Sequence, residues 1–302
     1  MSSQDVPQSQ SDARACELIR RARQAMSGEA GFAGIQTFRV SGKYRRTVKY
    51  ASVQSPTKVV EKERRLSGRV EIEIALPDKF RKRVKGESMR GFGYSYAEIV
   101  NGGEAWRDPP LRPISSNRDG RVIDVGDVER TEWMSAMSAK HQLSYYALGF
   151  LLQPLPGFPL VMSYAGEYQE SDGKVDVVLA QNGGGFRALL LLDPKTRLLK
   201  ALALRFVESV PQLVMVETAG FFDRRFMQET FARARRERQA RAKPPREYEL
   251  QLRFSDHRLV SGLQLPHRVT TTLNGEVVEE MTIGEFELNR PINPKRFLRK
   301  TE

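Results

Sequence analysis

The sequence predicts an α+β fold dominated by antiparallel strands, with helices added to them. Residues 70–76 and 248–254 alternate apolar and polar side chains with a period of two, the pattern of a strand with one face in water. Several Asn-Gly and Asp-Gly dipeptides separate apolar segments and favour tight hairpin turns. Strands joined by such turns are antiparallel, and only three segments show helical spacing.

The composition is that of a basic globular protein with few groups for catalysis or metal binding. The chain has 302 residues, a formal net charge of +12, one Cys and three His. One Cys excludes an intramolecular disulfide, and three scattered His do not favour a zinc site. No apolar run reaches the roughly 18 residues that a membrane-spanning helix needs. We therefore expect no metal and no cofactor.

Residues 1–11 are polar, and we expect them to be disordered ahead of a single domain over residues 12–302. They lack the basic and apolar stretches of a signal peptide, which leaves a cytoplasmic protein and a mature exported form as open alternatives.

The first helix is expected over residues 12–26, with Asp12 as its N-cap. Helical spacing places four side chains on one apolar stripe and predicts that the lone cysteine is buried among them. They are Cys16, Ile19, Ala22 and Met26.

Beyond this helix the pattern becomes that of strands. Glu71 and Glu73 alternate with Val and Ile, so both are expected on a solvated face rather than as a catalytic pair. Near the end of the chain the apolar positions change parity across Gly284, which predicts a β-bulge there. The predicted turns are Asn101-Gly102, Asp119-Gly120, Asp172-Gly173, Asn182-Gly183 and Asn274-Gly275.

One predicted hairpin, residues 188–207 with a turn at Asp193-Pro194, is apolar at both parities. A hairpin buried on both faces needs a cover on each side. A helix can cover one face, and more protein or a ligand can cover the other. Both alternatives remain open at this stage.

Two further helices are expected, over residues 131–152 and 221–243. The second belongs to a basic insertion at about residues 221–246, in which nine Lys/Arg face two Glu between Arg224 and Arg246. This insertion is interpreted as a solvated element, as a cover whose arginines meet anionic head groups, or as a nucleic-acid arm. The last is the weakest interpretation, because no aromatic residues interleave with the arginines in the basic half of the helix, residues 235–243.

No pattern of catalytic residues is recognisable, so we predict that the protein is not an enzyme. There is no GxSxG motif. Asp256 and His257 are adjacent and would point to opposite faces of a strand, so they do not form a triad with Ser261.

Several motifs resemble, in order, those of the lipoprotein-carrier superfamily of LolA/LolB-like proteins. They are the run from Asn101 to Pro109 (NGGEAWRDP), the strand from Val70 to Phe80 with its Leu-Pro-Asp-Lys-Phe-Arg end, the hairpin from Leu189 to Phe206, and the ending from Leu265-Pro266 through Leu288-Asn289 to Phe297. The resemblance extends over most of residues 12–300.

This resemblance implies an unclosed antiparallel β-barrel, a curved sheet with helices covering its concave side. It also implies a periplasmic protein that holds acyl chains or another hydrophobic ligand in a cavity. The helices at 131–152 and 223–243 would then be movable covers. The basic insertion is not part of the family pattern.

We therefore predict a non-enzymatic binding or carrier protein for a lipid, acyl chain or lipoprotein in the bacterial envelope, with possible membrane-surface or envelope-protein partners. Nucleic acid is an unlikely partner. The alternative is an envelope sensor or interaction protein that docks an acidic partner through its basic helix. The predicted ligand-binding residues are Ile72, Ile74, Trp106, Leu189, Leu191, Leu202, Leu204, Arg224, Arg225 and Arg233.

Overall fold

The computed structural model describes residues 12–27, 32, 34–55, 58–87, 93–109, 114–116, 122–124, 128–154, 159–183, 185–208, 214–216 and 246–299. Within them lie the α-helices α1 (Ala13–Ser27) and α2 (Val128–Leu151) and a short 3-10 helix, η1 (Pro294–Phe297). The strands are β1 (Thr37–Ser55), β2 (Lys58–Ala75), β3 (Lys79–Glu87), β4 (Gly93–Asn101), β5 (Glu104–Asp108), β6 (Ile114–Ser116), β7 (Val122–Asp124), β8 (Val161–Glu170), β9 (Gly173–Gln181), β10 (Arg187–Leu192), β11 (Leu199–Glu208), β12 (Val214–Val216), β13 (Arg246–Val260), β14 (Leu263–Leu273) and β15 (Glu276–Leu288).

These strands form one curved sheet that does not close. Its main path runs β5-β4-β3-β2-β1-β15-β14-β13-β11-β10-β9-β8, with antiparallel pairs throughout. In the described part of the chain β5 and β8, the two ends of this path, do not pair with each other. The short strand β12 adds to β1 in parallel. The predicted β-dominated α+β class and the unclosed antiparallel barrel are confirmed.

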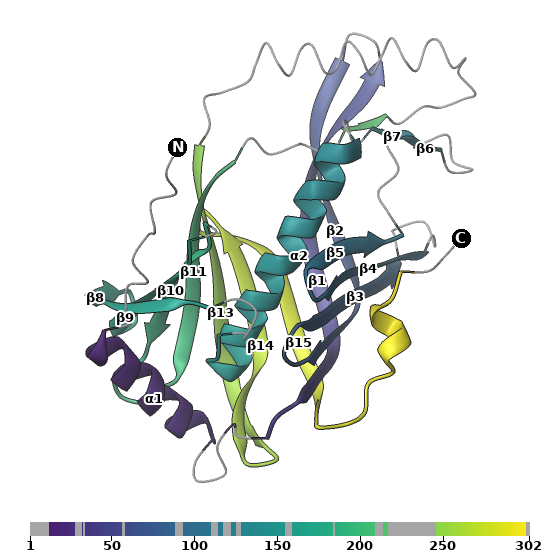
Figure 1. Ribbon diagram of the computed structural model, residues 1–302. Helices are drawn as coiled ribbons and strands as arrows, with labels where there is room; N and C mark the ends of the chain where they lie inside the picture. The colour runs from purple at the N-terminus through teal and green to yellow at the C-terminus, as the bar shows by residue number, and fades with distance from the viewer. Residues whose placement is uncertain are drawn as a thin grey trace, which may run out of the picture.

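Both helices lie on the same side of the sheet, and this side is called the inner face here (Figure 1). Helix α2 crosses the sheet and contacts β4, β5 and β11, while α1 packs against β8 and β14. Side chains of α1, α2 and most strands join in one apolar core between the helices and the inner face. No helix among the described residues combines the length and apolarity needed to span a membrane.

Helix α1 begins as predicted, but its stripe needs a correction. The backbone N–H of Ala15 donates to the Asp12 carboxylate at 2.6 Å, which confirms the N-cap. Ala22 and Met26 are buried in the core and Ile19 packs at its edge. Cys16 is exposed, so the prediction of a buried cysteine is wrong. Ala15, one position earlier, faces the core in its place.

The turns and the bulge follow from local sequence. Asn274 and Gly275 both have positive φ, 50° and 83°, as a tight turn between β14 and β15 requires. The pairing of β1 with β15 steps from Ser41–Glu285 to Gly42–Ile283, so Gly284 is the predicted bulge. The turn expected at Asp119-Gly120 and the helix expected over residues 221–243 lie outside the described residues.

The hairpin that is apolar on both faces is formed by β10 and β11. Its side chains on opposite faces of the sheet pack in two separate apolar clusters. Leu190, Leu202 and Leu204 belong to the core on the inner face. Leu191 and Ala201 are buried on the opposite, outer face, in a small cluster with Val175, Val177 and Ala203. The prediction of apolar packing on both faces is therefore confirmed.

Glu71 and Glu73 are not on a solvated face. Glu73 is only 1% exposed, and the Arg81 guanidinium lies 2.8 Å from its carboxylate. Arg296 of η1 also forms an ion pair with Glu73, and Arg39 does so with Glu71. Arginines from β1, β3 and η1 thus neutralise both glutamates on the outer face, which the alternation pattern of β2 alone could not reveal.

Candidate ligand-binding site

The residues predicted to bind a ligand do not lie together. Ile72, Ile74, Leu202 and Leu204 are on the inner face, in the core under α2. Leu189 and Leu191 are on the outer face, because Leu190 pairs with Leu202 and the neighbouring positions point the other way.

The remaining predicted residues lie elsewhere. Trp106 packs in a third cluster with Ile99 and Phe297, beside η1. Arg224, Arg225 and Arg233 lie outside the described residues. The described members of the predicted set therefore lie on both faces of the sheet, and their contact with a ligand stays a prediction.

The inner face is divided into an apolar half and a charged half. The apolar half surrounds the C-terminal turns of α2, where the Phe150 ring lies 5.4 Å from the Phe38 ring and 6.1 Å from the rings of Phe254 and Phe286. Gly149 permits a close approach here, since a Cβ on it would lie 2.3 Å from the Phe254 ring. Side chains of the protein itself fill this half.

The charged half contains a set of side chains that we call the inner charged cluster. It consists of Arg46, Lys82, Glu98, Arg107 and Glu279, from β1, β3, β4, β5 and β15. Alternation explains their direction: Lys82 lies between Phe80 and Val84, both buried in the core, and so faces inward with them.

Lys82 and Glu279 meet across the inside of the sheet. The Lys82 Nζ atom lies 3.4 Å from the Glu279 Oε1 atom. Lys82 lies directly opposite Ile72 of β2. Glu279 lies opposite Arg46 of β1, which in turn lies opposite Leu66 of β2. The two charged residues are therefore level with positions of β2 that are six residues apart. Six residues of strand span about 20 Å, so a flat sheet would hold the two groups far apart. Strong coiling of the sheet brings them together.

The charges in this cluster stabilise one another against burial. Lys82 is 7% exposed, and burial lowers its pKa, but Glu279 together with Tyr146, Glu98 and Tyr96 outweighs this effect and the pKa is raised. Burial likewise raises the pKa of Glu279, yet Lys82 and Arg46 bring it below its ordinary value. Both groups therefore carry their charges at neutral pH.

The cluster has an excess of positive charge. It contains three cations, on Arg46, Lys82 and Arg107, and two carboxylates, on Glu98 and Glu279. Arg64 of β2 is a further cation at an inward-facing position. The Nε atoms of Arg64 and Arg107 are buried without a hydrogen-bond partner. Arg107 instead lies 3.9 Å over the Tyr96 ring, and burial lowers its pKa. Arg46 is solvent-exposed, so the cluster is open to water at one side.

Helix α2 contacts this cluster through polar groups. Gln142 donates to the Glu98 carboxylate at 2.9 Å, and the Lys82 ammonium lies 5.5 Å from the Tyr146 ring centroid. Burial raises the pKa of the Tyr146 hydroxyl to about 12. The same helix is therefore held by apolar packing at its C-terminal end and by polar contacts near its middle.

Sequence analysis did not identify these residues, although one signal was present. Lys82 lies at a position of β3 where alternation predicts an apolar, core-facing side chain. Arg46 lies on the same face of β1 as the core residues Val40 and Tyr44, so each cation interrupts a row of core-facing side chains. A cation at a core position is unusual and marks a site for an opposite charge. No group of three His, Cys, Asp or Glu side chains that could hold a metal lies within the described residues.

Comparisons with known proteins matched solved structures but no related sequence. No family model matches the chain, and no curated protein matches it. A LolA superfamily protein from Nitrosomonas europaea is 12% identical with a TM-score of 0.45, over 94% of this chain and 97% of that one. A putative outer membrane lipoprotein-sorting protein domain from Vibrio parahaemolyticus is 8% identical with a TM-score of 0.43, over 94% and 96%.

A DUF1329 family protein from Desulfovibrio piger is 10% identical with a TM-score of 0.45, over 96% of this chain and 98% of that one. Two of these three structures carry names from the superfamily that the sequence motifs resemble. At such identities and TM-scores, these likenesses carry no conclusion about this chain.

Proposed function

We propose that this protein is a non-enzymatic binder of an amphiphile with an acyl chain and an anionic head, which it holds between α2 and the inner face of the sheet. The observation that carries this proposal is the placement of an excess of cations beside an apolar core, both under one helix. An acyl chain requires the first region, and an anionic head requires the second.

The apolar part of the ligand would replace contacts that α2 now makes. Ile72 and Ile74 of β2 and Leu202 and Leu204 of β11 form the inner surface that the helix covers. Each buried methylene contributes about 0.8 kcal/mol, so a long acyl chain competes effectively with a few side chains of the helix.

The anionic head would meet Arg46 first. Arg46 is the exposed cation of the cluster, and Arg107 and Arg64 each have a buried Nε–H without a partner. A carboxylate or phosphate would satisfy these donors through charge-assisted hydrogen bonds. Glu279 and Glu98 offset part of this positive charge, which limits repulsion among the cations.

Helix α2 is the element that would move. Its C-terminal turns are fixed by the close contact of Gly149 with Phe254, whereas Gln142 makes a part-buried hydrogen bond to Glu98 that water or a ligand can replace. The helix would pivot on its C-terminal end and uncover the charged half first.

The test is uptake of palmitate and of palmityl alcohol by delipidated full-length protein, measured by native mass spectrometry and fluorescence displacement. We expect both compounds to bind. The Arg46→Gln variant should bind palmitate about tenfold more weakly, because one charge-assisted contact is lost, and its affinity for palmityl alcohol should be unchanged. Arg205→Gln, at an exposed strand arginine paired with Glu249, is the control and should change neither. Failure of the wild-type protein to take up either compound would refute the proposal.

We also place this function in the bacterial periplasm, which is what the motif resemblance implies. Fractionation of the native host, with the protein detected in the periplasmic or the cytoplasmic fraction, decides this point.

A further inference from the structure

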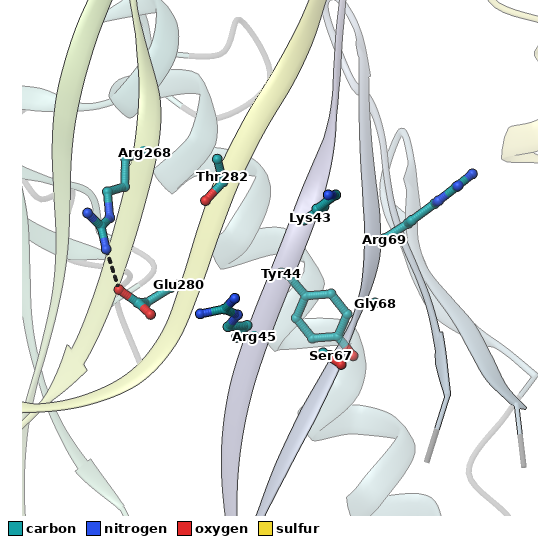
Figure 2. Close-up of a pocket in the computed structure, with 9 residues that line it drawn as sticks. All are labelled: Lys43, Tyr44, Arg45, Ser67, Gly68, Arg69, Arg268, Glu280 and Thr282. Atoms are coloured by element: carbon teal, nitrogen blue, oxygen red, sulfur yellow. Dashed lines mark hydrogen bonds and ion pairs between the residues drawn. The ribbon is translucent and has the colours of Figure 1, made fainter. Parts of the chain in front are cut away.

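The outer face of the sheet carries a second feature, which we call the outer basic groove. It is a hollow of about 470 Å³ lined by Lys43, Tyr44, Arg45, Ser67, Gly68, Arg69, Arg268, Glu280 and Thr282 (Figure 2). The residues come from β1, β2, β14 and β15, four neighbouring strands of the sheet.

Alternation places these side chains away from the core. Tyr44, Val70, Val269 and Met281 are buried on the inner face, so their neighbours in sequence point outward. The groove therefore lies on the side of the sheet opposite α2, and it is separate from the inner charged cluster.

The groove has cations without partners. Arg268 and Glu280 form an ion pair at 2.9 Å, but no carboxylate of the described residues pairs with Lys43, Arg45 or Arg69. Further exposed cations on the same outward register extend the basic surface over β2 and β3. They are Arg65, Arg83 and Lys85.

We propose that the outer basic groove docks an extended acidic segment of a partner protein. Lys43 and Arg45 are two residues apart on one strand, so their side chains leave the sheet about 7 Å apart. Carboxylates at alternate positions of an extended peptide have the same spacing. The hydroxyls of Ser67 and Thr282 add donors for carboxylate oxygens.

Two other kinds of partner fit less well. A planar bilayer surface does not enter a hollow between side chains, and no exposed apolar side chain lines the groove for insertion into lipid; those of the described residues, Tyr168, Leu259, Val277 and Leu298, lie elsewhere. An apolar ligand would meet five charged side chains in the lining of the groove.

The test uses the full chain and a fluorescein-labelled peptide of alternating Glu and Ser, followed by fluorescence anisotropy at increasing salt. We expect saturable binding that salt weakens, and at least tenfold weaker binding to the double variant Arg45→Gln/Arg69→Gln. The matched control is Arg187→Gln/Arg205→Gln, which removes two exposed strand arginines elsewhere and should change binding less than twofold.

Three outcomes would overturn the proposal. They are no binding of the peptide, equal weakening by both double variants, and groove-dependent binding of phosphatidylglycerol vesicles without binding of the peptide. Palmitate uptake by the Arg45→Gln/Arg69→Gln protein should remain unchanged, so this result does not depend on the inner site.

Discussion

The two halves of the inner face differ in what holds α2 against them. In the apolar half, Phe150 is fully buried among aromatic rings and Gly149 allows direct contact with Phe254. In the charged half, Gln142 and Tyr146 meet the carboxylate of Glu98 and the ammonium of Lys82.

Apolar packing is lost only when the fold opens, whereas the part-buried hydrogen bond of Gln142 can be exchanged for one to water. The difference teaches that one helix can be a structural element at one end and a movable cover at the other.

The largest effect is expected from Phe150→Ala in the apolar half. Removing a fully buried aromatic ring leaves a cavity and lowers the free energy of unfolding by about 3–5 kcal/mol. Urea denaturation followed by circular dichroism measures this loss. A loss below about 1 kcal/mol would mean that the C-terminal turns of α2 are not anchored by packing.

A smaller loss, about 2–3 kcal/mol, is expected from Lys82→Met in the charged half. This change leaves the Glu279 carboxylate buried with less compensation, and removal of one partner of a buried ion pair is costly. The double variant Lys82→Met/Glu279→Leu is the control and should recover most of the loss. If the double variant is as unstable as the single one, the pair does not act as a unit.

The pH dependence of stability measures the contribution of the Glu279 carboxylate in the Lys82–Glu279 pair. Because the pKa of Glu279 in the folded protein lies below its ordinary value of 4.5, its contribution is fully present above that value and is lost as the pH falls through the folded pKa. Wild-type protein should therefore lose more stability than Glu279→Gln between pH 6 and pH 3.5, in urea titrations at both values. Equal losses of stability in the wild-type protein and in Glu279→Gln would contradict a lowered pKa of Glu279. Lys82, whose pKa is raised, does not titrate in this window.

The features that sequence analysis predicted correctly are local ones. The Asp12 cap, the Asn274-Gly275 turn and the bulge at Gly284 each depend on a few adjacent residues. The β-dominated class follows from the sum of such signals, and the helix expected over residues 131–152 corresponds closely to α2.

The charged contacts could not be predicted in the same way. Lys82 and Glu279 are 197 positions apart and meet only because the sheet coils. Glu73 is buried because Arg296 is brought to it from 223 positions away by η1. Because β10 is apolar at consecutive positions, its sequence does not distinguish the side chains of the inner face from those of the outer face. Leu189 and Leu191, which lie on the outer face, were therefore grouped with residues of the inner face.

The smallest effect is expected from Gln142→Met, which tests the polar attachment of α2 directly. The variant loses the part-buried hydrogen bond to the charged Glu98 carboxylate, worth about 1.5 kcal/mol. Hydrogen exchange should become faster at the amides around position 142 and stay unchanged at Phe150 and Leu151, because the apolar half still fixes the end of the helix. Equal acceleration along all of α2 would show that the helix opens as one unit, and the pivot would then be wrong.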